Sequence, residues 1–258
     1  MPLSPHIIVT GGDNKAINLI RRSFVAKYGA PSWAANQIYQ VPWGTREWPS
    51  ADDADQHAAR ANRDANLIER FANRNETVAP LPPYFGVSLD AEFYGFLGFE
   101  DPRCLDADLI RAFRVRIAEI KAASGGRAKV YSWNVGAPDN KDGVEPEYIS
   151  RVSSFLLGCG FDGWISALVP QTVDENRLAI RTRRVAEAHD AVLAEVRRTN
   201  AVFQGFISFQ PIFRHIWQPL ISSAKGAILG EIGDRPWLMW CQAETEESAA
   251  VFAQGVAA

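Results

Sequence analysis

Two carboxylates, Asp90 and Glu92, stand two residues apart in the apolar segment 87–93 and are the first candidates for chemistry. On a β-strand, residues two apart project from the same side. Neighbouring carboxylates repel each other, so one of them tends to keep its proton. Such an acid can protonate the oxygen that leaves a glycosidic bond. We predict Glu92 as a general acid, with Asp90 tuning it or stabilising charge on the sugar. The alternative is an acid pair that faces solvent or a buried arginine.

A tryptophan and an amide, Trp133 and Asn134, end the strand predicted over residues 128–134. An amide can bond sugar hydroxyls or orient a carboxylate, and an indole can stack on a sugar face. Adjacent residues on a strand point in opposite directions, so both reach one site only if the strand ends between them. The alternative for Trp133 is packing beneath a helix.

Three further candidates, Trp240, Gln242 and Glu244, alternate along the last predicted strand and share one face if the strand extends that far. Glu244 is then a second candidate catalytic carboxylate. It directly precedes Thr245, a predicted N-cap, so the alternative is an acid that the helix dipole attracts.

Two more candidates, Asp13 and Trp43, follow the first two predicted strands. Asp13 is either a site residue or the N-cap of a helix from Asn14. Trp43 belongs to the polar stretch 42–55, which we place on the catalytic face of a barrel. The chain has eight tryptophans, mostly near strand ends or loops, and large aromatic faces beside polar groups suit carbohydrate binding. We expect about half of them in the core.

The sequence lacks the residue patterns that metal-dependent, Schiff-base and serine-nucleophile chemistry require. The four histidines form no paired metal motif, no lysine marks a strand end for a Schiff base, and no Gly-x-Ser-x-Gly elbow occurs. The segment 10–13 is too short for a dinucleotide fingerprint. We therefore predict no metal and no cofactor.

The elements that must position these residues follow from one alternation along the chain. Short β-branched and aromatic runs alternate with segments of helical period, which predicts a mostly parallel sheet. We predict a (β/α)8-type TIM barrel, with irregular closure or seven clear strands, as a single domain over residues 1–258; the alternative is an open doubly wound sheet. The predicted strands are 6–10, 37–41, 84–93, 128–134, 162–169, 202–209 and 236–242. An eighth, 226–232, is weakened by its glycines.

Composition restricts partners and compartment. The formal net charge of −3 gives no basic excess for a nucleic-acid partner. Three widely spaced cysteines (Cys104, Cys159 and Cys241) predict free thiols in a reducing compartment. The start of the chain lacks a signal-peptide pattern, and no apolar run approaches the ~18 residues that span a membrane. We expect a soluble, cytoplasmic protein, or one released without a signal peptide, including in a viral particle.

The segment 81–136 resembles the muramidase-type and chitinase-type barrel glycoside hydrolases. In those families a strand ends in Asp-x-Glu and the glutamate protonates the leaving oxygen, which carries over to Asp90 and Glu92 here. Gly86 and Ser88 stand where the chitinase type has further aspartates. Asp13 comes after the first strand, whereas the muramidase type has an aspartate within it.

Three functions follow as hypotheses. The first is a glycoside hydrolase acting on or binding a polysaccharide or a peptidoglycan-like glycan. The second is a non-catalytic barrel that binds, or builds a larger assembly such as a viral particle. The third is a sugar-phosphate or isomerase barrel, for which the sequence shows no phosphate loop and no metal set.

Overall fold

Seven parallel strands close into a ring in the described part of the chain. The computed structural model describes residues 6–10, 14–29, 37–42, 48–58, 60–61, 86–90, 102–126, 128–135 and 145–258. The ring runs β1 (His6–Thr10), β2 (Gln37–Pro42), β3 (Gly86–Asp90), β4 (Lys129–Val135), β5 (Gly163–Leu168), β6 (Gln204–Phe209) and β9 (Trp237–Gln242). Strand β9 pairs with both β6 and β1, which closes the barrel. The predicted barrel class is confirmed, with seven strands in the described ring.

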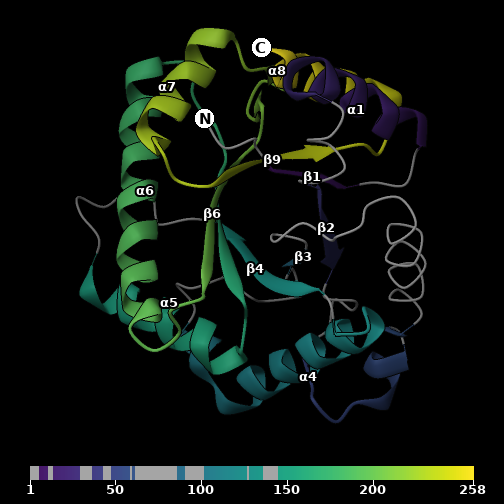
Figure 1. Cartoon of the computed structure of the whole chain (residues 1–258), viewed down its shortest axis with the longest axis vertical. Helices are drawn as coiled ribbons and strands as arrows, with labels where there is room; N and C mark the ends of the chain where they lie inside the picture. Colours follow the sequence, from purple (N-terminus) through teal and green to yellow (C-terminus); the bar gives the residue numbers. More distant parts are fainter. Residues whose placement is uncertain are drawn as a thin grey trace.

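Helices surround this ring on its outer side (Figure 1). They are α1 (Asn14–Tyr28), α4 (Ala107–Ala123) after the short helix η2 (Pro102–Leu105), α5 (Pro146–Cys159), α6 (Glu175–Arg197), α7 (Ser222–Ile232) and α8 (Glu246–Ala257). Helices α1 and α8 lie side by side. Thr245 caps α8 as predicted, in a capping box with Ser248.

The connection between β6 and β9 departs from the predicted pattern. The eighth strand expected over residues 226–232 is wrong, because these residues belong to α7, where Ala224, Ile228 and Ile232 are buried at a spacing of four. A two-stranded antiparallel hairpin, β7 (Ile212–Phe213) and β8 (Gln218–Pro219), precedes that helix. The hairpin follows the carboxyl end of β6, so it lies at the end of the barrel where proteins of this fold class carry their sites.

The two faces of the sheet can be told apart at Gly205. A Cβ atom at Gly205 would lie 2.3 Å from Leu193 Cδ1 of α6, so this position faces the helices. Its neighbour Phe206 therefore faces the barrel interior, because successive residues alternate. Residues in register on neighbouring strands lie on the same face of the sheet. By this register, four further residues also face the interior: His6, Tyr131, Trp133 and Trp240.

Aromatic rings fill the interior. The rings of Tyr131 and Phe206 meet edge to face at 5.4 Å, and His6 meets Phe206 at 5.0 Å. Burial lowers the pKa of His6 to about 4, so it is uncharged at neutral pH. The Tyr131 ring has room because both neighbouring strands carry glycine beside it: a Cβ at Gly86 would lie 2.3 Å from Tyr131 Cε2, and one at Gly163 would lie 2.6 Å from Tyr131 Cδ1.

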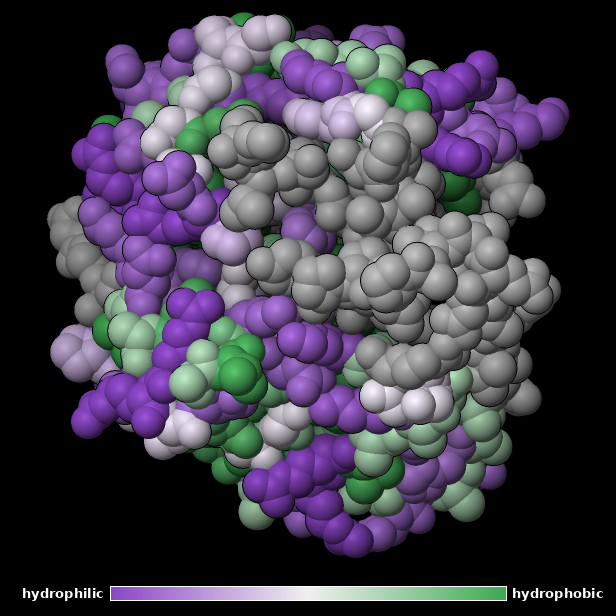
Figure 2. Space-filling view, viewed as in Figure 1, coloured by the Kyte–Doolittle hydropathy of each residue, from purple (hydrophilic) through white to green (hydrophobic). Residues whose placement is uncertain are grey.

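The described surface is mainly hydrophilic on the face that Figure 2 shows, with small separate apolar areas. Exposed large apolar side chains include Ile216, Trp217 and Ile221, which belong to the β7–β8 hairpin and the turn before α7. Of the helices in the described ranges, none combines the length and the apolar character that crossing a bilayer requires.

Replacing Gly163 by alanine tests the packing of the interior. The new methyl group would collide with the Tyr131 ring and with the Gln204 carbonyl, 2.6 Å away. We expect the free energy of unfolding to fall by roughly 1–3 kcal/mol, the usual cost of overpacking, as measured by urea denaturation. The matched control is Gly226→Ala, at an exposed position in α7 with no atom within 4 Å of the added methyl. There alanine should raise stability by up to about 1 kcal/mol. Equal stability of Gly163→Ala and the wild type would contradict the packing described.

Candidate functional site at the carboxyl end of the barrel

The carboxyl ends of the parallel strands meet at one end of the ring, where barrels of this class place their sites. Asp90 is the last residue of β3 and is in register with Pro42 of β2 and Trp133 of β4. Thr10 and Gln242 are the last residues of β1 and β9 and are in register with each other. The topology thus brings Asp90, Trp133 and Gln242 to the same end. Three predicted site residues, Asp13, Trp43 and Glu92, lie outside the described residues.

The two tryptophans predicted to line the site contact each other. Trp133 and Trp240 stack with ring centroids 5.9 Å apart and an interplanar angle of 29°. Trp240 also meets Phe252 of α8 edge to face at 6.4 Å and is only 8% exposed. Trp133 is half-buried, and its Nε1 atom is buried without a hydrogen-bond partner in the described part of the chain. The pair therefore forms the apolar floor of this end, with one indole donor unsatisfied.

Asn134 directly follows Trp133 within strand β4. The strand continues to Val135, so it does not end between the two residues, and Asn134 is in register with Ser166 of β5. The condition under which both residues reach one site, a strand that ends between them, is therefore not met.

Gln242 occupies the rim and is held by an arginine that the sequence analysis did not select. Arg214 Nη1 donates a hydrogen bond to Gln242 Oε1 at 3.2 Å. The Arg214 guanidinium also lies over the Trp217 ring, 4.8 Å from its centroid. The Arg214 backbone N–H donates to the Pro170 carbonyl at 2.9 Å, which ties the hairpin to the chain beyond β5.

Gln210 is the second residue that the sequence analysis missed. It directly follows β6, is 7% exposed, and its Oε1 atom is buried with no hydrogen-bond partner among the described residues. Its backbone N–H points to the Leu168 carbonyl at the end of β5. A polar residue between an apolar strand and Pro211 is a signal that was visible in the sequence. Arg214 had no such signal, because its hairpin was not predicted.

Glu244 lies next to the amino end of α8, as expected for the alternative in which the helix dipole attracts this acid. Strand β9 ends at Gln242, so Glu244 lies two residues beyond it, is exposed, and immediately precedes the cap Thr245. It is thus separated from the strand face that Trp240 and Gln242 share. An acid at this place interacts favourably with the amino end of α8.

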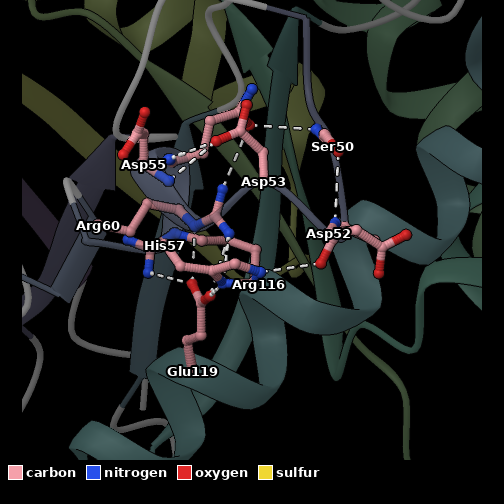
Figure 3. A network of polar contacts seen from close by, with 10 residues as sticks. Ser50, Asp52, Asp53, Asp55, His57, Arg60, Arg116 and Glu119 are labelled. Atoms are coloured by element: carbon pink, nitrogen blue, oxygen red, sulfur yellow. Dashed lines mark hydrogen bonds and ion pairs between the residues drawn. The ribbon is translucent and has the colours of Figure 1, made fainter.

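A second polar cluster lies on the outer side of the barrel, between the helical residues 54–58 and 60–61 and α4 (Figure 3). Glu119 accepts hydrogen bonds from Arg60 Nε at 2.8 Å and Arg60 Nη2 at 3.1 Å. His57 Nδ1 lies 2.6 Å from the same carboxylate, and Arg116 Nη1 lies 3.4 Å from it. Arg60 and Arg116 are buried.

This outer cluster is structural. Burial alone would raise the pKa of Glu119, but hydrogen bonds from Arg60 and His57 and the charges of Arg60 and Arg116 outweigh it and lower the pKa. Each ring nitrogen of His57 has a partner, because Nε2 donates to the Ala51 carbonyl. The cluster therefore joins two helical segments, and the side-chain contacts described here are all within the protein.

Two other buried ionisable groups also serve packing. His189 stacks on Trp164 at 5.3 Å on the helix-facing side, and burial lowers its pKa to about 3. Lys225 donates to the Gly255 and Val256 carbonyls at the end of α8, and burial lowers its pKa to about 8. No group of three or more potential metal-ligating side chains occurs in the described ranges.

Removing the Glu119 charge tests the outer cluster. Glu119→Gln removes the carboxylate that the buried Arg60 and Arg116 contact, and we expect a loss of roughly 3 kcal/mol in the free energy of unfolding. Because the folded pKa lies below the ordinary value of 4.5, the ionised carboxylate stabilises the fold above that pH, and its contribution is lost as pH falls through the folded pKa.

The measurement is urea denaturation from pH 7 to pH 3. The wild type should lose the Glu119 contribution below about pH 4.5, and Glu119→Gln should lack that part of the pH dependence. The control is Glu147→Gln, which breaks an exposed pair with Arg151 one turn away and should cost under about 0.5 kcal/mol. Similar losses in the two variants would contradict the assignment.

The chain was compared with known proteins. No family model and no curated protein matches it. Among solved structures, it is similar to orotidine 5'-monophosphate decarboxylase from Methanocaldococcus jannaschii, complexed with the inhibitor BMP. The two chains are 9% identical, 98% of each is covered, and the TM-score is 0.37. At this level of similarity the neighbour's reaction is not transferred to this chain.

The predicted glycoside hydrolase that acts on or binds a glycan is corrected by these findings. The similar solved structure is a decarboxylase and not a glycoside hydrolase. Trp240, expected as a sugar platform, is nearly buried between Trp133 and Phe252. The roles in glycosidic cleavage predicted for Asp90, Glu92 and Glu244 are withdrawn with that function.

Proposed function

We propose that this chain binds a small polar molecule at the carboxyl end of its barrel, above the Trp133–Trp240 pair. The observation that carries the proposal is a pair of buried polar atoms without partners among the described residues: the donor Trp133 Nε1 and the acceptor Gln210 Oε1. Folded proteins pair nearly all such groups, and each one left unpaired costs about 1–3 kcal/mol. A ligand with both an acceptor and a donor satisfies the two atoms together.

The position of the unpaired groups supports this assignment. Trp133 lies on the interior face of β4, and Gln210 directly follows β6, so both belong to the end where the strands finish. Two other unpaired groups, Ser166 and His189, lie on the helix-facing side of the sheet, away from any site in the barrel. Ser88 Oγ is also unpaired and lies deeper along β3.

The opposite end of the interior is packed with aromatic rings in the described part of the chain. Tyr131, Phe206 and His6 fill it, and the Tyr131 hydroxyl is engaged by Gln204 Oε1 at 2.5 Å. This arrangement matches the division in barrels of this class, where one end stabilises the fold and the other carries function.

The indole N–H of Trp133 provides a direct test. Protein carrying ¹⁵N-labelled tryptophan gives one indole signal for each tryptophan, and Trp133→Phe identifies the signal of Trp133. The probes are a panel of hydroxy acids, nucleotides, amino acids and small amides. We expect at least one compound to shift the Trp133 signal saturably, and Trp133→Phe to weaken its binding about fivefold or more, the value of one hydrogen bond of roughly 1 kcal/mol.

Trp237→Phe is the matched control. Trp237 lies on the outer side of β9 against Phe209, 5.6 Å away, so its replacement should leave binding unchanged. Gln210→Leu should weaken binding as Trp133→Phe does. No response of the Trp133 signal to any probe, or equal binding by the wild type, Trp133→Phe and Gln210→Leu, would sink the proposal.

A further inference from the structure

The β7–β8 hairpin carries a positive charge to the rim of the proposed site. Arg214 follows β7, and its backbone N–H is bonded to the Pro170 carbonyl beyond the end of β5. Its side chain reaches Gln242, the last residue of β9. Ile212 and Phe213, just before it, are buried in the main core, which fixes the base of the hairpin. One arginine therefore joins the chain beyond β5 and β6 to the end of β9.

The guanidinium is positioned by neutral groups. It donates to the Gln242 amide oxygen at 3.2 Å and lies over the Trp217 ring at 4.8 Å. Trp217 has φ 51°, and it is the single non-glycine residue with positive φ among the described residues. A bulky side chain in this conformation costs of order 1–3 kcal/mol and persists where the surroundings impose it. Trp217 also meets Phe252 edge to face at 5.8 Å, which holds the ring in place.

The charge of Arg214 is not compensated by a carboxylate in the described part of the chain, because no carboxylate there lies within ion-pair distance of it. Two other arginines differ: Arg183 pairs with Glu231 and Arg235 with Asp190, each at 2.7 Å. Arg214 is exposed, so its remaining N–H groups are accessible from the solvent side of the rim.

Gln242 adds donors beside this charge. Its Oε1 accepts from Arg214, which leaves the two hydrogens of its Nε2 for another partner. A planar guanidinium next to an amide N–H₂ forms a set of donors that fits the oxygens of a carboxylate or phosphate. Cation and donors come from two separate segments, the hairpin and β9, that the fold brings together.

We propose that the ligand of this site carries an anionic group, a carboxylate or a phosphate, and that Arg214 binds this group together with Gln242. The inference rests on the proposed function, because it names the charge of the molecule that the site above Trp133 takes. Trp217 is a positioning residue: it holds the guanidinium over its ring and does not itself contact the ligand.

The experiment uses two simple anions, inorganic phosphate and succinate, with glycerol as the uncharged comparison, at low ionic strength. The readouts are the ¹⁵N indole signals of Trp217 and Trp133. We expect both anions, and not glycerol, to shift the two signals saturably. The tighter of the two anions identifies which group the site prefers. Arg214→Gln should weaken anion binding about tenfold or more, since it removes a charge-assisted contact.

Arg214→Lys keeps the charge but lacks the planar fork, so it should restore part of the affinity. Arg183→Gln removes an arginine that pairs with Glu231 on the outer helices and should bind anions as the wild type does. Gln242→Leu should weaken binding less than Arg214→Gln, because it removes donors without removing charge.

Two outcomes separate this inference from the proposed function. If uncharged probes shift the Trp133 signal but anions bind equally to the wild type and Arg214→Gln, or bind to neither, the charge assignment is overturned and the binding function stands. If anions bind through Arg214 and shift Trp217 while Trp133 responds to no probe, both are overturned, because the anion then lies outside the proposed site.

Discussion

The narrow interior of the seven-stranded ring is the constraint on which the rest of this structure depends. A closed parallel ring has to fill its own centre, and here Tyr131, Phe206 and His6 do so. The Tyr131 ring fits only because Gly86 and Gly163 flank it on the neighbouring strands. With this part of the interior filled, the carboxyl end, where Trp133 and Trp240 stack, is where we propose that a ligand binds.

Two groups of charged residues in the described part of the chain have different consequences. On the outer side, Arg60 and Arg116 contact the Glu119 carboxylate, which joins the helical residues 54–58 and 60–61 to α4. At the rim, Arg214 is held by an amide and an aromatic ring, neither of which neutralises it. In the first arrangement the charges pair with one another and stabilise the fold. In the second, the positive charge of Arg214 stays accessible to solvent. The number of polar contacts is therefore a poor guide to function, and the identity of the partners is a better one.

Much of the fold could be predicted from the sequence because strand and helix periods differ so clearly along the chain. The strands of the ring and the helices α1, α4 and α6 follow from apolar spacing. The segment 226–232 was misassigned because its glycines and short apolar run hid a period of four that Ala224, Ile228 and Ile232 reveal. For the site, Trp133, Trp240 and Gln242 were found at strand ends. Gln210 was missed although its place between an apolar strand and Pro211 was visible in the sequence. Arg214 was missed because its position depends on a hairpin that no local pattern encodes.

An odd number of strands has a geometric consequence for how this barrel packs. In an eight-stranded barrel, alternate strands supply the side chains of each interior layer, so odd and even strands divide the work evenly. Seven strands cannot be divided evenly in this way. At some point in the ring, two neighbouring strands must therefore depart from the alternation of large and small interior side chains. Because β6 pairs directly with β9, the barrel closes with seven strands. The large Tyr131 side chain between two glycines on the neighbouring strands is one such adjustment. Inserting a strand between β6 and β9 would therefore require repacking the whole centre and not only the seam.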